Sequence, residues 1–382
     1  MFQFRAPQVM RERELLQRSG MSLGLTSAEW LSRARSDLRL GLPILLQDRD
    51  RYAIAMAAET VSAARLRDFL ALQGEASLAI TARRAETLKA AAYDGDLARL
   101  EIPAGAACDW IWSVADPADD LRVPMKGPFR VLRGGLARVH RVVLQLAKDA
   151  RLLPAALVCE LSGEIGVAAE DLTVLDVDTL DDGPGQIARL SEVVSARVPL
   201  SVSEAGRLHV FRPSDGGEEH YAVEIGSPSR EDPVLARLHS ACFTGDLLGS
   251  LKCDCGPQLR GALGQMGADG AGVLLYLNQE GRGIGLANKI RAYALQDQGF
   301  DTVEANHRLG FEDDERDFRI GAALLREMGF STVRLMTNNP AKVRMLEANG
   351  IAVVERVPLK VGETTHNEGY LRTKATKSGH IL

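Results

Sequence analysis

Three of the five cysteines in this chain of 382 residues lie within fourteen positions of one another, at Cys242, Cys253 and Cys255. Cys253 and Cys255 are two apart, a spacing that puts both side chains on one side of an extended strand or turn. Cys242 can reach them across a short loop. Three protein ligands leave the fourth tetrahedral position of a zinc ion to water, as catalytic zinc sites do. The spacing therefore predicts a catalytic zinc site. A structural zinc with a distant fourth ligand, or a disulfide with a spare thiol, are the alternatives.

Composition narrows the class of protein. The first residues, MFQFRAPQVMRERELL, are charged from Arg5 onward and lack the apolar core of a secretion signal, so we expect a cytoplasmic protein in which a disulfide is disfavoured. No apolar run approaches the length of a membrane span. A net charge of −5 and a pI near 5.9 argue against a protein that coats nucleic acid. The expected ligand is a small molecule.

The pattern of strands and helices predicts two α/β domains, with some α+β character. An acidic stretch with Gly183-Pro184-Gly185 reads as a connector. We therefore expect an N-terminal extension over 1–36, a first domain over 37–175, a linker over 176–196 and a second domain over 197–382. Apolar runs and helical periodicity predict these elements: strands at 41–48, 75–81, 206–213, 220–226, 233–240, 272–277, 332–337 and 352–358, and helices at 57–74, 141–151, 257–267, 286–299, 315–329 and 340–350.

Two segments of the second half suit phosphate. The glycine-rich loop 278–285 follows an apolar strand and opens a helix, so backbone N–H groups can approach an anion closely. Thr337 and Lys342 flank a predicted helix N-terminus at the carboxyl end of a strand, where open α/β sheets bind ligands. Each segment can also be explained by local structure alone, without a ligand. The first can be a strand-to-helix turn, and the second an N-cap followed by proline.

Charged side chains gather between Asp301 and Phe318, with Asp314 and Arg316 in the densest part. A charge run is usually a solvated helix face. Asp314 and Arg316 are two apart and would lie on different faces of a regular helix. If both contact one ligand, this stretch must be a loop or a first helical turn. Tyr293, alone on its predicted helix, is more typical of packing than of chemistry.

These segments together resemble GTP cyclohydrolase II over about Val198 to Leu382. The resemblance is carried by RLHSACFTGD, CDCGPQL, LYLNQEGRGIGL, KIRAYALQDQGFDTVEANHRLGF, DERDF, MTNNP, ERVPL and the closing GH, in this order. The family opens the imidazole ring of GTP in the first step of riboflavin synthesis. It releases formate and pyrophosphate and leaves 2,5-diamino-6-(5-phospho-ribosylamino)pyrimidin-4(3H)-one.

The resemblance implies roles for individual residues. It makes Cys242, Cys253 and Cys255 the zinc ligands, Asp314 the proton acceptor and Arg316 the group that acts on the α-phosphorus, with Tyr293 assisting ring opening. A guanidinium is charged at all physiological pH, which favours electrostatic stabilisation by Arg316 over nucleophilic attack. The implied GTP contacts are Arg237, Leu238, His239, Ser240, Ala241, Gln258, Glu280, Gly281, Arg282, Thr302, Thr337 and Lys342. The resemblance also implies Mg²⁺ on the polyphosphate and a homodimer.

Two positions depart from the family pattern. Ala241 stands where the family usually has glutamate, directly before the first zinc ligand, so contacts there would be made by the backbone alone. Asn278 stands where the family usually has arginine or a similar polar group, and this loss weakens the expected affinity for the triphosphate.

Residues 37–175 resemble 3,4-dihydroxy-2-butanone 4-phosphate synthase, without its chemistry. Tyr52-Ala53-Ile54-Ala55 replaces the acidic metal-binding run of that family, and His140 aligns one residue away from the histidine of its GHTEA stretch. The synthase needs clustered carboxylates for magnesium and enolisation. We therefore expect an inactive domain with the synthase fold, in which His140 is a surface or packing residue, and a role as scaffold, dimerisation element or regulator.

Three alternatives to a monofunctional cyclohydrolase remain. A zinc nucleobase deaminase also uses three ligands, but its H-x-E and P-C-x-x-C signatures are absent. A bifunctional riboflavin enzyme is disfavoured by the missing acidic run. A regulator that senses GTP without turnover has no use for a reactive water, so the complete set of catalytic residue types argues against it.

Overall fold

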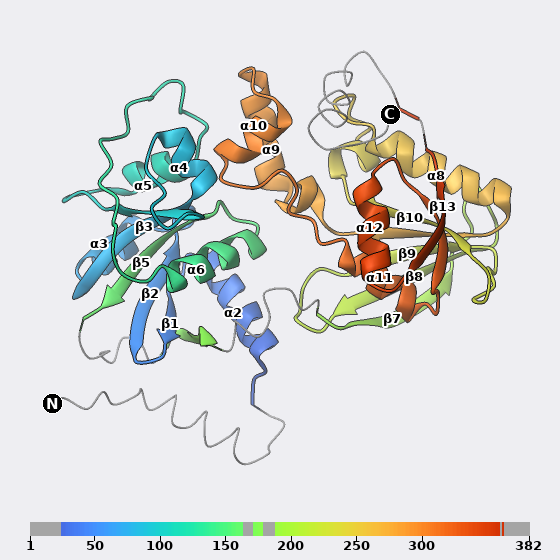
Figure 1. Cartoon of the computed structure of the whole chain (residues 1–382), viewed down its shortest axis with the longest axis horizontal. Helices are drawn as coiled ribbons and strands as arrows, with labels where there is room; N and C mark the ends of the chain where they lie inside the picture. Colours follow the sequence, from blue (N-terminus) through green and yellow to red (C-terminus); the bar gives the residue numbers. More distant parts are fainter. Residues whose placement is uncertain (1–23, 163–170, 179–187, 360, 363–382) are drawn as a thin grey trace. The chain divides into compact units, whose positions relative to one another are not determined.

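The computed structural model describes residues 24–162, 171–178, 188–359 and 361–362, and Figure 1 shows their arrangement. The predicted extension up to residue 23, the Gly183-Pro184-Gly185 connector and the basic tail from Leu371 lie outside the described residues. The chain forms two compact units. The first comprises Met1–Gln186, Ile290–Phe300 and Glu304–Glu312, and the second comprises Ile187–Lys289, Asp301–Val303 and Asp313–Leu382.

A six-stranded sheet in the order β4-β3-β5-β2-β1-β6 organises the first unit. Its neighbours pair antiparallel except for β1 and β6, which are parallel. The elements of this unit before the linker are α2 (Ser27–Arg39), β1 (Ile44–Asp48), β2 (Arg51–Ala57), α3 (Ala63–Leu70), β3 (Gly74–Thr81), α4 (Ala82–Leu88), β4 (Leu97–Glu101), α5 (Cys108–Ala115), α6 (Arg138–Asp149), β5 (Ala155–Leu161) and β6 (Thr173–Asp176).

The apolar run that replaces an acidic metal site is strand β2, between β1 and β5. Tyr52, Ala53, Ala55 and Met56 are buried, so these side chains pack, as predicted. The predicted helix over 57–74 begins only at Ala63. Its first predicted residue ends strand β2, and the Ser62 side chain caps α3 by accepting the Arg65 N–H.

His140 is a packing residue on the inner face of α6, with 1% of its surface exposed. Its Nε2 lies 3.1 Å from the Ser77 hydroxyl. Burial, with a further contribution from the charge of Arg99, lowers the pKa of His140 to about 4. The imidazole is therefore neutral at pH 7, in a core built from α2, α6 and the sheet.

The first unit also contains a segment that lies far along the chain, Ile290–Phe300 with Glu304–Glu312. The predicted domain limits placed it within 197–382. Its apolar side chains Leu295, Leu309 and Phe311 are almost fully buried. The Thr81 hydroxyl donates to the Gly310 carbonyl over 2.7 Å. Burial of these apolar side chains, about 2 kcal/mol each, favours packing of the segment within this unit.

A seven-stranded sheet in the order β13-β12-β10-β11-β9-β8-β7 organises the second unit. Four parallel strands, β13, β12, β10 and β11, adjoin an antiparallel β9, β8 and β7. The strands are β7 (Leu190–Arg197), β8 (Gly206–Pro213), β9 (His220–Ile225), β10 (Val234–Ser240), β11 (Gly272–Leu277), β12 (Thr332–Met336) and β13 (Ala352–Val357). The helices from residue 240 onward, in either unit, are the π-helical turn η2 (Phe243–Leu247), α8 (Cys255–Asp269), the 3₁₀ turn η3 (Glu280–Gly283), α9 (Leu286–Asp297), α10 (Thr302–Arg308), α11 (Arg319–Glu327) and α12 (Pro340–Ala348).

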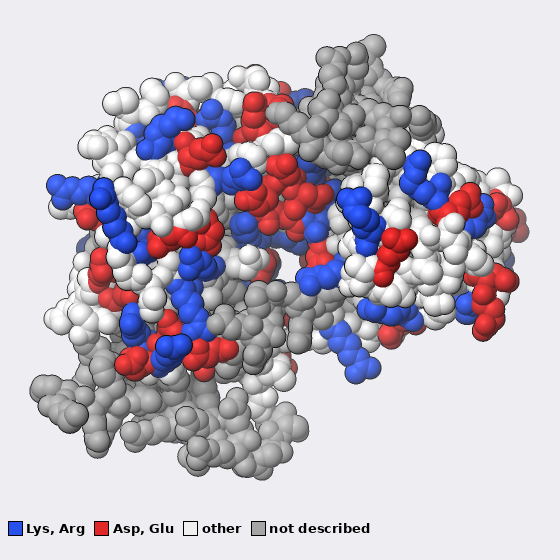
Figure 2. All heavy atoms as spheres, viewed as in Figure 1, with Lys and Arg blue, Asp and Glu red and all other residues white. Residues whose placement is uncertain are grey.

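The mixed α/β class and most predicted elements of the second half are confirmed. One helix is shorter than predicted, because α11 begins at Arg319 and leaves 313–318 irregular. Acidic and basic side chains are interspersed over the visible face of each unit in Figure 2. None of the described helices is both long and apolar enough to cross a membrane.

Candidate active site

The three predicted zinc ligands come together. Their sulfur atoms all lie within 4.8 Å of one another, and those of Cys242 and Cys253 are 3.8 Å apart. None of the three cysteines is part of a disulfide. A disulfide needs about 2.05 Å between sulfurs, whereas two sulfurs bound about 2.3 Å from one tetrahedral zinc lie about 3.8 Å apart. The separation therefore suits two ligands of one metal ion.

Short local structures bring the cysteines together. Cys242 follows β10 and caps η2, Cys253 lies in the loop after η2, and Cys255 opens α8. Gly245 makes room for them. A Cβ atom there would lie 2.6 Å from the Cys253 sulfur and 3.1 Å from the Cys242 sulfur. The donor set, the sulfur separation and this glycine cradle fit a zinc ion held by three thiolates.

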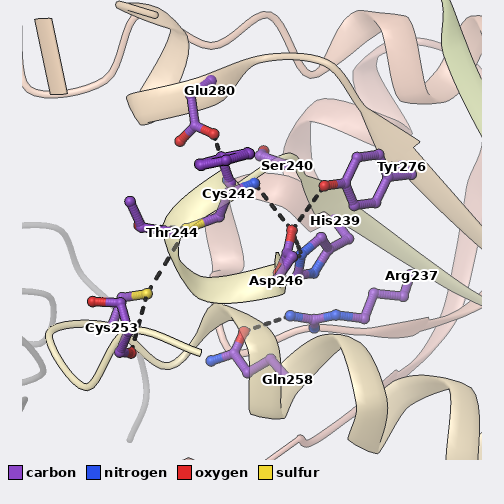
Figure 3. Close-up of polar contacts among 12 residues, drawn as sticks. Arg237, His239, Ser240, Cys242, Thr244, Asp246, Cys253, Gln258, Tyr276 and Glu280 are labelled. Atoms are coloured by element: carbon purple, nitrogen blue, oxygen red, sulfur yellow. Dashed lines mark hydrogen bonds and ion pairs between the residues drawn. The ribbon is translucent and has the colours of Figure 1, made fainter. Parts of the chain in front are cut away.

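Asp246 fixes the backbone that carries the first ligand (Figure 3). Its carboxylate accepts the Cys242 N–H at 3.0 Å and the Tyr276 hydroxyl at 2.9 Å. It also lies 3.1 Å from His239 Nε2. Burial lowers the pKa of His239, although Asp246 opposes the shift. His239 and Tyr276 therefore act here as rigid partners of Asp246. Asp246 and Tyr276 were not among the site residues predicted from the sequence.

A buried ion pair touches the same cluster. Lys289 Nζ lies 3.1 Å from the Cys242 sulfur and 2.8 Å from Glu280 Oε1. Hydrogen bonds with Cys253 and Cys255, aided by the Lys289 charge against the effect of burial, lower the pKa of Cys242. Glu280 also accepts the Phe243 N–H at 2.5 Å. The surroundings thus favour the thiolate form of Cys242, whereas the hydrogen bond with Cys242 raises the pKa of Cys253. Lys289 was not among the predicted site residues.

The predicted contacts from Arg237 to Ala241 lie on β10 and directly after it. Arg237 is buried and donates to the Met336 carbonyl. It also donates to Gln258 Oε1 (Figure 3). Burial lowers its pKa to about 10, so it remains charged at pH 7. Leu238 packs in the core, and its carbonyl accepts a hydrogen bond from Lys342 Nζ. Ala241 joins the sheet through its N–H, which donates to Leu277.

The glycine-rich loop folds into the turn η3, where Gly281 and Arg282 have left-handed φ angles of 63° and 61°. Glycine adopts this conformation at little cost, but an arginine there is strained. The strain is compensated by contacts with the charged loop. Arg282 Nη1 donates to the Asp313 carbonyl, and the Arg282 carbonyl accepts the Glu315 N–H. A Cβ at Gly283 would lie 2.7 Å from the Glu315 carbonyl.

Asn278 takes a structural part in the same region. Its backbone N–H donates to His220 Nδ1 over 3.0 Å, and its side-chain amide donates to the Glu219 carbonyl. The amide therefore links the end of β11 to the start of β9.

Asp314 and Arg316 lie in the irregular loop before α11 and pair with each other. Arg316 Nε and Nη2 donate to the two Asp314 oxygens at 2.7 and 2.5 Å. Burial raises the pKa of Asp314, but the hydrogen bonds and the charge of Arg316 lower it by a larger amount. The net effect is a pKa below the usual value. Arg316 Nη1 is 3.4 Å from the Ser240 hydroxyl, beside the first ligand. Residues 313–318 are thus a loop, the local structure that would let Asp314 and Arg316 contact one ligand.

The segment with Thr337 and Lys342 is the start of an N-capped helix, which is the alternative interpretation given from the sequence. Asn339 accepts the Ala341 N–H, Pro340 opens α12, and Thr337 Oγ1 accepts the Asn339 N–H. Lys342 Nζ donates to the Leu238 carbonyl and lies 4.8 Å from the Phe318 ring centroid. Because the Arg316 guanidinium stacks on the same ring at 4.7 Å, two cations flank one aromatic side chain.

Two predicted residues lie on other helices. Thr302 opens α10, in the short stretch assigned to the second unit. Tyr293 is half-buried on α9, in the part assigned to the first unit. The second unit therefore contains the cysteines and the other predicted site residues, whereas Tyr293 belongs to the first unit.

Comparison with known proteins places the chain in a family. The family model for GTP cyclohydrolase II matches residues 191–358. A GTP cyclohydrolase-2 from Azospirillum brasilense is 45% identical over 360 residues, covering 92% of this chain and 94% of that protein. The riboflavin biosynthesis protein RibBA of Bacillus subtilis is 41% identical over 70% of this chain and 71% of its own length.

Shorter and more distant relatives differ in what they cover. A GTP cyclohydrolase-2 from Shigella dysenteriae is 55% identical over 51% of this chain but 98% of its own length. The crystal structure of RibBX, a two-domain 3,4-dihydroxy-2-butanone 4-phosphate synthase from A. baumannii, covers 86% of this chain and 99% of its own at 18% identity with a TM-score of 0.29. The near full-length match at 45% identity, together with the assembled cysteine cluster, shows that this chain belongs to the GTP cyclohydrolase II family.

Proposed function

We propose that this chain hydrolyses GTP to 2,5-diamino-6-(5-phospho-ribosylamino)pyrimidin-4(3H)-one, formate and pyrophosphate, the first step of riboflavin biosynthesis. The observation that carries the proposal is the cluster of Cys242, Cys253 and Cys255, which are not in disulfides and have sulfur separations suited to one tetrahedral metal ion. Family membership supplies the substrate, since a relative that matches 92% of this chain at 45% identity is a GTP cyclohydrolase-2.

The three cysteines would hold one zinc ion per chain. When bound, zinc supplies a water of lowered pKa as the nucleophile for C8 of the purine. Thiolates prefer soft metals, so zinc rather than magnesium is expected at this position. The Asp246 carboxylate keeps the Cys242 backbone in place during the reaction, because it already accepts that N–H.

Asp314 and Arg316 would work as a pair that separates. While Arg316 binds Asp314, the carboxylate has a lowered pKa and is a weak base. When Arg316 engages the α-phosphate instead, Asp314 loses its cation and its basicity rises. Asp314 then accepts a proton during ring opening, and Arg316 stabilises charge at the phosphorus. Tyr293 would assist ring opening, a role that rests on the family resemblance alone.

The remaining predicted residues would bind GTP. Arg282 and Lys342 are cations beside backbone turns and suit the phosphates. Gln258 or Glu280 can read the guanine edge by hydrogen bonding. We expect Mg²⁺ to be held mainly by phosphate oxygens and water, as is usual for this ion. The other proposed contacts are the backbone from Arg237 to Ala241, with Gly281, Thr302 and Thr337.

We further propose a cytoplasmic homodimer whose first domain, 37–175, has no synthase activity. The lack of synthase activity is supported by β2, where buried apolar side chains stand in place of a carboxylate cluster. A bifunctional riboflavin enzyme is the second candidate, because the match to the riboflavin biosynthesis protein RibBA spans 281 residues, which is longer than the second domain over 197–382.

A product assay distinguishes a cyclohydrolase from a deaminase and from a GTP sensor. Zinc-loaded protein is incubated with Mg²⁺ and GTP, and formate, pyrophosphate and ammonia are measured. We expect formate and pyrophosphate in equal amounts. Ammonia without formate would indicate a deaminase, and saturable GTP binding without any product would indicate a sensor. Either result would overturn the proposal.

A further inference from the structure

Lys289 lies buried beside the cysteine cluster, between two groups that carry negative charge. Only 9% of its surface is exposed. Its ammonium is within hydrogen-bond distance of both the Cys242 sulfur, at 3.1 Å, and Glu280 Oε1, at 2.8 Å. A lysine is rarely buried unless it is paired, so this placement needs a partner on each side.

The surroundings hold the ammonium at this point. Lys289 projects from the first turn of α9 past Gly281, where an added Cβ would lie 3.0 Å from the lysine Cβ. Glu280 is fixed in turn, because its oxygens accept the N–H groups of Phe243 and Gly281. The chain of contacts Glu280–Lys289–Cys242 thus joins the turn η3 to the turn η2.

Charge explains what the lysine does there. Three thiolates around a divalent ion carry a net charge of −1, and the Glu280 carboxylate adds a second negative charge nearby. Without the ammonium, a thiolate and a carboxylate would face each other in a buried place, and each would destabilise the other.

We propose that Lys289 is a positioning residue of the metal site, which donates a hydrogen bond to the Cys242 thiolate, separates it from Glu280 and thereby strengthens zinc binding. The inference rests on the proposed zinc site. Partners of metal ligands typically change metal affinity by about 10- to 100-fold when they are removed.

Metal binding tests this role without any measurement of turnover. Full-length Lys289→Met protein is freed of metal and titrated with zinc against a chromophoric chelator. We expect affinity about tenfold lower than in the wild type, and Lys289→Arg should recover most of it. In the cobalt(II) form, the sulfur-to-cobalt charge-transfer bands should move to lower energy, since a thiolate without its N–H donor holds its electrons less tightly.

Two further variants sharpen the result. Lys252→Met alters an exposed lysine next to Cys253 and should leave zinc affinity and the cobalt spectrum unchanged. Lys289→Met combined with Glu280→Gln removes the second anion too, and should recover part of the lost affinity. If Lys289→Met does not fold, Lys289→Gln replaces it with the same expected loss.

The outcomes separate this inference from the proposed function. Wild-type protein that binds no metal through the cysteines would overturn both. Wild-type protein that binds zinc while Lys289→Met binds it equally well, with an unshifted cobalt spectrum, would overturn only the role of Lys289.

Discussion

At the residue scale, the site depends on sulfur atoms placed by short turns. Replacing Cys253 by serine removes one of three thiolates and leaves an oxygen that binds zinc poorly at neutral pH. We expect Cys253→Ser protein to lose both its zinc and its release of formate, measured by metal analysis and by a formate assay. Cys108→Ala, in the first unit, should keep both. A Cys253→Ser protein with full zinc content and activity would refute the assignment.

Asp314 and Arg316 give a second prediction at this scale. Removing the guanidinium in Arg316→Ala takes away the groups that lower the pKa of Asp314, so that pKa should rise. Carbon-13 NMR of the labelled carboxylate reports the shift. We also expect pyrophosphate release to fall at least tenfold, while Asp314→Asn should chiefly slow formate release. Wild-type pyrophosphate release by Arg316→Ala would contradict the role of this arginine.

His140 makes the stability of the first unit depend on pH. Its pKa in the folded protein is about 4, below the unfolded value near 6.5, so the folded state binds fewer protons. Its contribution is therefore complete above pH 6.5 and is lost as pH falls toward 4. Between pH 7 and 5 the loss is about 2 kcal/mol. His140→Gln should show a correspondingly smaller decrease in urea denaturation followed by tryptophan fluorescence.

The fluorescence signal is specific to the first unit, since all three tryptophans, Trp30, Trp110 and Trp112, lie in it. Equal pH dependence in wild type and His140→Gln would show that the imidazole is already charged or exposed in the folded protein.

At the scale of elements, the segment 304–312 depends on a buried arginine of α4. Arg84 pairs with Asp120 and reaches the Arg308 carbonyl, with 1% of its surface exposed. Removing one partner of a buried pair costs about 3–5 kcal/mol. We expect Arg84→Met to destabilise the first unit by about this amount and to speed amide hydrogen exchange across 304–312.

Arg141→Met provides the matched control, because its ion pair with Asp96 is about half exposed on both sides. Such a pair contributes about 0–1 kcal/mol. Unchanged exchange in Arg84→Met would mean that Arg84 does not hold the segment.

The sequence predicted those elements whose signals are local. The three-cysteine spacing and the helix start at Pro340 each follow from residues close together in the chain. The predicted helix over 315–329 wrongly included 315–318, which belong to the irregular loop around Asp314. The sequence did not predict Lys289 or Asp246, because their partners are brought near only by the fold. Strand β2 was not among the predicted strands, and its last residue, Ala57, was wrongly assigned to the following helix. The packing of 304–312 is a long-range contact that no local pattern encodes.

At the scale of the whole molecule, the first domain should contribute structure and no synthase reaction. Buried apolar side chains on β2 cannot bind magnesium. We expect the full-length protein, given ribulose 5-phosphate and Mg²⁺, to form no 3,4-dihydroxy-2-butanone 4-phosphate by chromatography. A chain beginning at Ser195 would lose the surface that buries Leu309 and Phe311, and should lose solubility, its oligomeric state or GTP turnover. Product formation, or a shortened chain that assembles and works like the full one, would contradict this account.

The central claim is that one zinc ion, held by Cys242, Cys253 and Cys255, is required for the opening of the GTP ring. The most direct measurement is a titration of metal-free protein with zinc, with formate release from GTP followed at each step. We predict that the rate rises in proportion to zinc and levels off at one ion per chain, with no rise in Cys253→Ser protein. Full formate release from the metal-free protein, or a plateau that Cys253→Ser shares, would contradict the claim.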